Sequence, residues 1–157
     1  MTDSNSWPLH LDAYPELSRA AYSPSEVYTE ADIKDLMRHA GEVRGCGNAS
    51  KGASADGKRG IDVVIEIDTP GHTASIAETH PDYVACFEAT PWTSKANQPP
   101  AGQLRFANET IQDFAAGIFE SLSSIVSSKY VGTGGDEINV ECMVRDTAFR
   151  RSEPDRR

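Results

Sequence analysis

Residues 61–67 read Ile-Asp-Val-Val-Ile-Glu-Ile, a run dominated by β-branched side chains. Such a run is typical of a strand that is covered on both faces, as in a parallel sheet. Residues 68–72, Asp-Thr-Pro-Gly-His, follow directly, and their Pro-Gly pair predicts a turn. We therefore expect residues 61–67 to be the central strand of the fold, with an acid and a histidine at its carboxyl end.

A second strand end carries two adjacent carboxylates. Residues 129–133 predict a short strand, and residues 134–139 continue as Gly-Gly-Asp-Glu-Ile-Asn. The glycines allow a tight turn, and the neighbouring charges of Asp136 and Glu137 repel each other, which indicates a functional role. In parallel α/β folds, active sites are built where strands end. The sequence therefore predicts an active site around Asp136 and Glu137.

Two amphipathic helices accompany these strands. Thr29 and Asp32 resemble a capping box, which predicts a helix from Ala31 to about Gly41. A second helix is expected to begin at an Asn108 or Thr110 cap. The apolar residues at helical spacing are Ile33, Leu36, Met37 and Ala40 on the first helix, and Ile111, Phe114, Ala115, Ile118, Phe119, Leu122, Ile125 and Val126 on the second. Alternating strands and helices predict the α/β class with a parallel sheet.

The remaining segments predict little regular structure. Residues 1–24 and 80–107 contain several prolines, so we expect them to be irregular. The expected packing contacts of the first are Trp7, Leu9, Leu11 and Leu17. Residues 43–58 are rich in Gly, Ser and Ala and predict a disordered insertion.

Composition limits the class of partner. The chain has 157 residues, enough for one domain, and a formal net charge of -9 at pH 7. This acidic balance disfavours nucleic acid and anionic membranes as partners. We find no apolar run long enough to span a bilayer and no signal-peptide pattern at the N-terminus. A neutral or cationic small ligand fits the composition better.

The cysteines and three of the histidines carry no clear functional pattern. Cys46, Cys86 and Cys142 are widely spaced and form no C-x-x-C motif, so we expect unpaired thiols and no zinc site. The three histidines without a functional pattern are His10, His39 and His80, and we expect them to be solvated or capping side chains.

Three stretches, in this order, resemble glycoside hydrolase family 20, the β-N-acetylhexosaminidases. They are residues 2–8 (Thr-Asp-Ser-Asn-Ser-Trp-Pro), residues 64–73 (Val-Ile-Glu-Ile-Asp-Thr-Pro-Gly-His-Thr) and residues 134–139. Supporting similarity includes Gly-Gln-Leu at residues 102–104. The resemblance covers residues 1–42 and 59–140 and is greatest to secreted fungal members.

The resemblance implies a (β/α)8 TIM barrel, of which residues 1–142 would supply about strands two to four with their helices. It implies release of terminal β-linked N-acetylglucosamine or N-acetylgalactosamine with retention, through an oxazolinium intermediate that the substrate's own acetamido group forms. Glu137 would be the general acid and base, Asp136 would bind the acetamido N–H and stabilise its positive charge, and His72 and Asp3 would form a relay behind Glu137. No metal and no organic cofactor are expected.

The chain also departs from the family pattern. A complete barrel needs roughly 250 residues, so we expect a fragment of the catalytic barrel. Removing residues 43–58 would restore a family-like junction, and residues 143–157 form a charged tail that is unrelated to the family or disordered. We interpret both segments as translated non-coding sequence; the alternative is a genuine insertion in a shortened paralogue. The parent is expected to be secreted, vacuolar or lysosomal, and the resemblance allows it to be a homodimer.

Two alternatives to an active glycosidase stay open. The first is a chain without catalytic activity, either a truncated remnant or a sugar-binding pseudoenzyme. A metal-dependent hydrolase that uses Asp68, His72, Asp136 and Glu137 ranks last, because one histidine among carboxylates is a poor set of transition-metal ligands. We expect the isolated chain to be weakly active or inactive, because a partial barrel leaves strand edges and apolar helix faces exposed.

Overall fold

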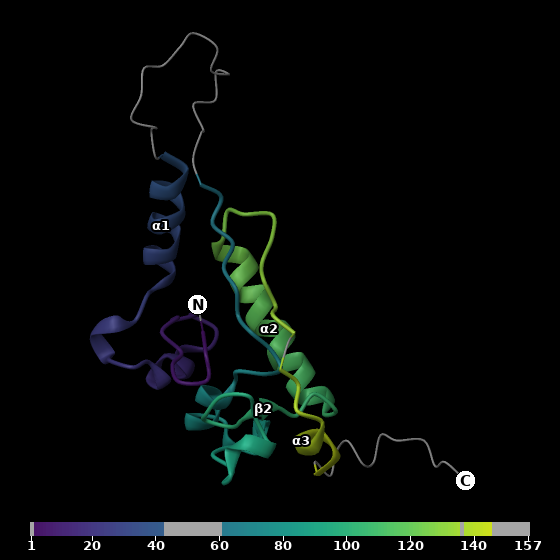
Figure 1. Cartoon of the computed structure of the whole chain (residues 1–157). Coiled ribbons are helices and arrows are strands. Elements are labelled where there is room, and N and C mark those ends of the chain that lie inside the picture. Colours follow the sequence, from purple (N-terminus) through teal and green to yellow (C-terminus); the bar gives the residue numbers. More distant parts are fainter. Residues whose placement is uncertain (1, 43–60, 136, 146–157) are drawn as a thin grey trace.

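The computed structural model describes residues 2–42, 61–135 and 137–145 (Figure 1). The segments predicted as an insertion (43–58) and, beyond residue 145, as a tail lie outside these residues. The α-helices are α1 (Glu30–Glu42), α2 (Glu109–Ile125) and α3 (Val140–Arg145), and the strands are β1 (Val84–Ala85) and β2 (Gln103–Leu104). Within the described ranges, five short 3-10 helices span Pro15–Ala20, Pro24–Glu26, Ala74–Glu78, Pro81–Tyr83 and Trp92–Ser94.

Three extended segments lie side by side and parallel to one another. The amide of Ile67 donates to the carbonyl of Gly132 (3.0 Å), and the amide of Gly132 donates to the carbonyl of Ile65 (2.8 Å). The amide of Thr69 then donates to the carbonyl of Thr133 (3.0 Å), and Thr2 forms a parallel bridge to Ile67 on the other side. The parallel arrangement of the two predicted strands is therefore confirmed. The prediction that residues 61–67 and 129–133 are full strands is wrong, because the pairing consists of isolated bridges.

The prediction that residues 61–67 are covered on both faces is wrong. Ile65 and Ile67 are buried, whereas Ile61 is 67% exposed and Val64 is 49% exposed. This alternation is typical of a strand with one covered face. One face packs into the core, and the described residues leave the other open.

The core lies between α2 and the N-terminal segment. The stripe of α2 is buried at Ile111, Phe114, Ala115, Ile118, Leu122 and Ile125, as predicted, and Phe119 and Val126 pack at its margin. The predicted contacts Trp7, Leu9, Leu11 and Leu17 are fully buried as well. On α1, Ile33 and Met37 are buried, but Leu36 is 48% exposed, so its predicted burial is wrong.

Both predicted helix caps are present. The amide of Thr29 donates to Oδ2 of Asp32 (2.8 Å), and the amide of Asp32 donates to Oγ1 of Thr29 (3.2 Å). The hydroxyl and amide of Thr29 together hold the pKa of the Asp32 carboxyl below its usual value. Oδ1 of Asn108 accepts from the amide of Thr110 (3.0 Å) at the start of α2. Local sequence therefore determines where both helices begin.

Residues 80–107 contain more regular structure than we expected. β1 and β2 pair antiparallel, with Val84 opposite Leu104 and Ala85 opposite Gln103. The prolines that suggested an irregular segment lie mainly in the part between the two strands.

No helix among the described residues is long and apolar enough to cross a membrane.

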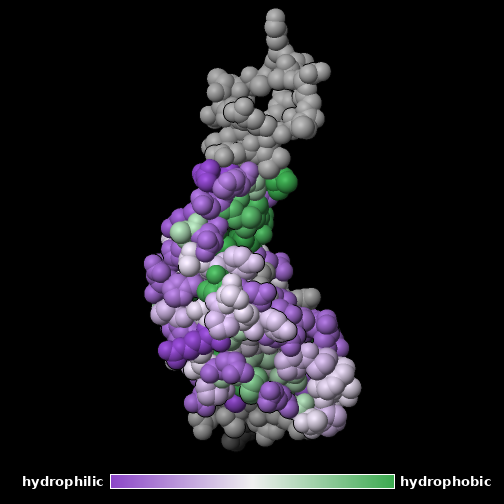
Figure 2. Space-filling view, turned by 90° about the vertical axis from the view of Figure 1, so that its left-hand side faces the viewer, coloured by the Kyte–Doolittle hydropathy of each residue, from purple (hydrophilic) through white to green (hydrophobic). Residues whose placement is uncertain are grey.

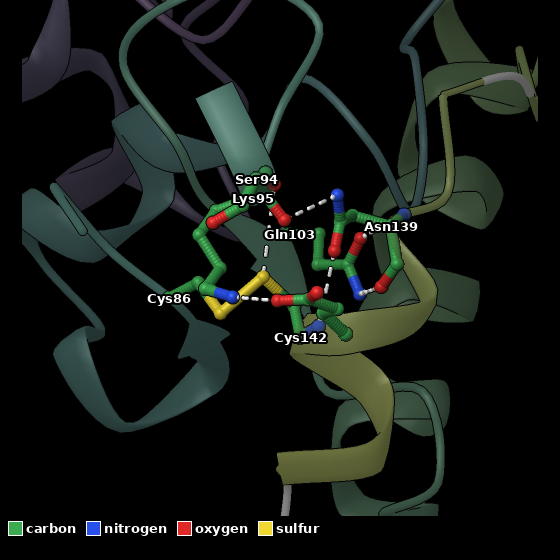
Figure 3. The surroundings of a disulfide bond; sticks show 7 residues. Cys86, Ser94, Lys95, Gln103, Asn139 and Cys142 are labelled. Carbon is green, nitrogen blue, oxygen red and sulfur yellow. Dashed lines mark hydrogen bonds and ion pairs between the residues drawn. A yellow bond between two sulfur atoms is a disulfide. The ribbon is translucent and has the colours of Figure 1, made fainter. Parts of the chain in front are cut away.

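Cys86 and Cys142 form a disulfide bond, so the prediction of unpaired thiols is wrong for these two residues (Figure 3). Their Cα atoms lie 5.7 Å apart although 56 positions separate them in the chain. The bond attaches the segment after β1 to α3, a helix that we did not predict. Cys46 lies outside the described residues.

A close approach requires glycine at position 134. Gly134 has φ +63°, and a β-carbon there would overlap the carboxylate of Asp68. Both features exclude a larger side chain, because φ in this range is strained for L-residues. The glycine therefore brings the turn after residue 133 against the end of the segment that contains Ile67.

We predict that removing the disulfide lowers the free energy of unfolding by about 4 kcal/mol, since the bond closes a long loop in the unfolded chain. The measurement is denaturant unfolding of the oxidised chain and of the Cys86→Ser/Cys142→Ser variant. Reductant should lower the midpoint of the wild type but not that of the double variant. Equal midpoints for oxidised and reduced wild type would contradict the prediction.

We also predict opposite effects for two glycine substitutions. Gly134→Ala should lower the free energy of unfolding by about 2 kcal/mol, because of the strained φ and the contact with Asp68. Gly41→Ala is the matched control: a β-carbon there, within α1, meets nothing within 4 Å and should add about 0.5 kcal/mol of stability. Denaturant unfolding measures both, and unchanged stability of Gly134→Ala would refute this account of the turn.

Candidate active site

Three of the four predicted catalytic residues lie together in one row. Nδ1 of His72 lies 3.2 Å from Oδ1 of Asp3, and Nε2 of His72 lies 2.9 Å from Oε2 of Glu137. The fourth, Asp136, lies outside the described residues. The imidazole thus has a carboxylate on each ring nitrogen.

The parallel pairing places these residues at one edge. Asp3 follows Thr2, His72 follows the turn after Ile67, and Glu137 follows the turn after Gly132. All three side chains therefore lie beyond the carboxyl ends of paired segments, where active sites form in parallel folds.

Short backbone contacts hold Asp3 in place. Its amide and carbonyl exchange hydrogen bonds with Ser6 (3.0 and 3.2 Å), and its carbonyl also accepts from Oγ of Ser75 (2.8 Å). Its carboxylate accepts from the amide of Ser4 (2.6 Å) through the oxygen that faces His72. Asp3 is therefore fixed on the side of the imidazole away from Glu137.

His72 and Glu137 both adopt the left-handed backbone region, with φ of +51° and +56°. Residues other than glycine rarely do so, and those that do gather at functional sites, where the surrounding structure holds them. The two strained residues contact each other through their side chains. This geometry is a second indication that the row is a functional site.

Asp68 lies against both His72 and the turn that precedes Glu137. Its Oδ1 accepts from the amide of Gly135 (3.3 Å), and its Oδ2 lies 3.9 Å from Nε2 of His72. Asp68 therefore connects the turn after Ile67 to the turn that carries Glu137. Within residues 2–42, 61–135 and 137–145, no three His, Cys, Asp or Glu side chains are grouped to hold a metal ion.

The row borders a small polar pocket. The side chain of His72 is 18% exposed and that of Glu137 is 25% exposed, so Glu137 is partly accessible. Besides these two, the pocket is lined by Ser4, Gly71, Lys95, Ala96, Gln98, Pro100, Gly102 and Gln103. A carboxyl that faces both a pocket and an anchored imidazole can exchange a proton with either, as general acid–base catalysis requires.

Sequence reasoning missed the contribution of residues 94–103. This segment supplies Lys95, Gln98 and Gln103 to the pocket, yet we expected it to be irregular and assigned it no function. The one available signal was the Gly-Gln-Leu similarity at residues 102–104. That similarity identifies the segment without stating what its glutamine does.

Comparison with known proteins gives a consistent family. The model of glycosyl hydrolase family 20, catalytic domain, matches residues 1–47 and 49–153. A beta-hexosaminidase of Emericella nidulans is 36% identical over 150 residues, which cover 90% of this chain and 22% of that protein. A chitooligosaccharidolytic beta-N-acetylglucosaminidase of Bombyx mori is 34% identical over 146 residues, covering 90% of this chain and 21% of that protein.

The fold comparison agrees. The crystal structure of a chitobiase from Flavobacterium johnsoniae superposes with a TM-score of 0.70 at 21% identity, covering 96% of this chain and 20% of that one. The chain thus spans about a fifth of the length of the relatives that it matches. Because the family model covers nearly the whole sequence, the chain belongs to glycosyl hydrolase family 20.

Proposed function

We propose that this chain carries the proton-transfer site of a β-N-acetylhexosaminidase. The observation that supports the proposal is the row Asp3–His72–Glu137, which lies at the carboxyl ends of three parallel segments. In this proposal residues 1–142 correspond to about strands two to four of a (β/α)8 barrel, whose active sites lie at that end. The boundary at residue 142 and the status of residues 43–58 and 143–157 remain predictions.

Glu137 is the proposed general acid and base. Protonated, it gives its proton to the glycosidic oxygen as the bond to the leaving group breaks. The carbonyl oxygen of the substrate's acetamido group forms the new bond to the anomeric carbon, which gives a cyclic oxazolinium ion. Glu137 then takes a proton from water as the water attacks the same carbon and the bond from that carbon to the acetamido oxygen breaks. Each displacement inverts the anomeric carbon, so the product retains the configuration of the substrate.

The neighbouring residues adjust this cycle. His72, fixed by Asp3, would donate a hydrogen bond to the Glu137 carboxylate after the first step and so stabilise its charge. Asp136 would accept a hydrogen bond from the acetamido N–H and stabilise the positive charge of the oxazolinium. Two adjacent acids with different partners can thus hold different protonation states.

The proposed substrate is an oligosaccharide or glycoconjugate that ends in β-linked N-acetylglucosamine or N-acetylgalactosamine. The names of the relatives support this substrate class. We propose that the parent is secreted, vacuolar or lysosomal, since the Cys86–Cys142 disulfide suits a protein that passes through an oxidising compartment. A homodimeric parent stays a prediction.

Two observations favour the alternative of a non-catalytic remnant. The chain covers about a fifth of its relatives, and large apolar side chains are exposed on it, among them Ile61, Val64 and Tyr130. Figure 2 shows hydrophobic surface directly below the grey segment, beside the polar surface. In a longer protein, further segments would cover such faces, and a complete sugar pocket would need their side chains.

The proposal predicts slow release of 4-nitrophenol from 4-nitrophenyl N-acetyl-β-glucosaminide by the 157-residue chain. Glu137→Gln should lower that rate at least about 100-fold, because it removes the transferable proton. Glu120→Gln, at an exposed position on α2, is the matched control and should keep the wild-type rate. The corresponding glucoside, which lacks the acetamido group, should not be cleaved.

A binding measurement separates the alternatives. A thiazoline derived from N-acetylglucosamine imitates the cyclic intermediate, and calorimetry measures its affinity. Binding without turnover would identify a sugar-binding pseudoenzyme. Neither binding nor turnover would identify a remnant and refute the proposed function.

A further inference from the structure

We propose that Gln103 is a positioning residue for Glu137, an inference that rests on the proposed function. Gln103 lies on β2 and is only 3% exposed. Its Oε1 accepts from the amide of Asn139 (2.8 Å), and its Nε2 donates to the carbonyl of the same residue (3.1 Å). Figure 3 shows the side chain of Gln103 against the backbone of Asn139, beside the disulfide. One buried amide thus pairs with both backbone groups of a residue two positions after Glu137.

The side chain of Asn139 makes two further contacts. Its Oδ1 accepts from the amide of Cys142 (3.1 Å) at the start of α3, and its Nδ2 donates to the carbonyl of Ser94 (3.2 Å). The Cys86–Cys142 bond attaches α3 to the same part of the chain. Gln103 therefore joins the segment after Glu137 to a part of the molecule that is held by several independent contacts.

The segment before Glu137 has an anchor of its own. The amide of Gly135 donates to Asp68, and Gly134 packs against the same carboxylate. Only three residues, 136–138, separate this anchor from Asn139. Ile138 is 47% exposed, so its packing does not fix the backbone.

The two anchors explain the strained backbone of Glu137. A glutamate keeps φ of +56° only when its surroundings impose that conformation. Without the two hydrogen bonds of Gln103, the backbone of Asn139 would lose its direct attachment to β2. Residues 137 and 138 could then relax, and the Glu137 carboxylate would leave its position 2.9 Å from His72. In this proposal Gln103 controls the distance between Glu137 and His72 through the backbone of Asn139.

The chemistry of the side chain explains why a glutamine suits this position. A carboxamide offers a donor and an acceptor together, which match the C=O and N–H of one residue, and it stays neutral. An ionised glutamate would lack the donor. An apolar residue would take the acceptor from the amide of Asn139 and would leave the carbonyl of Asn139 with the amide of Met143 as a donor (3.2 Å). Gln98 lines the same pocket but is exposed, which makes it the matched control.

The experiment measures the ring nitrogens of His72 in the 15N-labelled 157-residue chain by NMR at one fixed pH, with the signals assigned from His72→Gln. Glu137→Gln defines the displacement of the Nε2 signal when the partner carboxylate is lost. We expect Gln103→Met to move the Nε2 signal by more than half of that displacement, and Gln98→Met to leave it in place. The Nδ1 signal, which reports on Asp3, should stay near its wild-type position in Gln103→Met.

Each outcome decides a defined point. An unmoved Nε2 signal in a folded Gln103→Met chain would overturn this inference alone. If that variant does not fold, Gln103→Glu replaces it, because its carboxylate keeps the acceptor for the amide of Asn139. We expect Gln103→Glu to move the Nε2 signal by less than Glu137→Gln does. An unmoved Nε2 signal in Gln103→Glu would overturn the inference. If Glu137→Gln itself leaves Nε2 unmoved, the row is absent, and the proposed function fails together with this inference.

Discussion

The parallel backbone pairing of residues 65–69 with residues 131–133 is the interaction on which the rest of this structure depends. Three backbone hydrogen bonds and one from the hydroxyl of Thr69 hold it, and Thr2 adds a third segment on the other side of Ile67. Because the three segments run in the same direction, the residues that follow them emerge at one edge. A shift of the pairing by one residue would turn side chains to the opposite face and separate His72 from Glu137.

Two further sets of contacts fix the turn that carries Glu137. Asp68 fixes the near side of the turn that carries Glu137, and Gln103 fixes its far side through Asn139. The second set belongs to residues 86–103, which the disulfide attaches to α3. The same segment supplies side chains to the pocket, so stability and function share their residues there. The strained backbone at Glu137 is kept in place by these supports.

The sequence predicted the features that depend on neighbouring residues. The capping box of Thr29 and the stripe of α2 are local patterns, and both are confirmed. The resemblance to the family, which three motifs carry, implied the row of Asp3, His72 and Glu137, and the structure brings these side chains together. Their catalytic roles stay proposals.

What the sequence missed depends on distant partners. Ile61 and Val64 are apolar, but whether they are covered depends on segments that pack against them, and the described residues leave them exposed. Cys86 and Cys142 are far apart in sequence, and no spacing rule pairs two such cysteines. Gln103 lies among prolines with no periodic pattern, so only its contacts show that it fixes Asn139. The most direct measurement of the central claim is hydrogen exchange at the amides of Ile67, Thr69 and Gly132 in the 157-residue chain. The account predicts that all three exchange as slowly as the core amide of Leu122 in α2. Exchange at the rate of an unstructured peptide, while α2 stays protected, would contradict it.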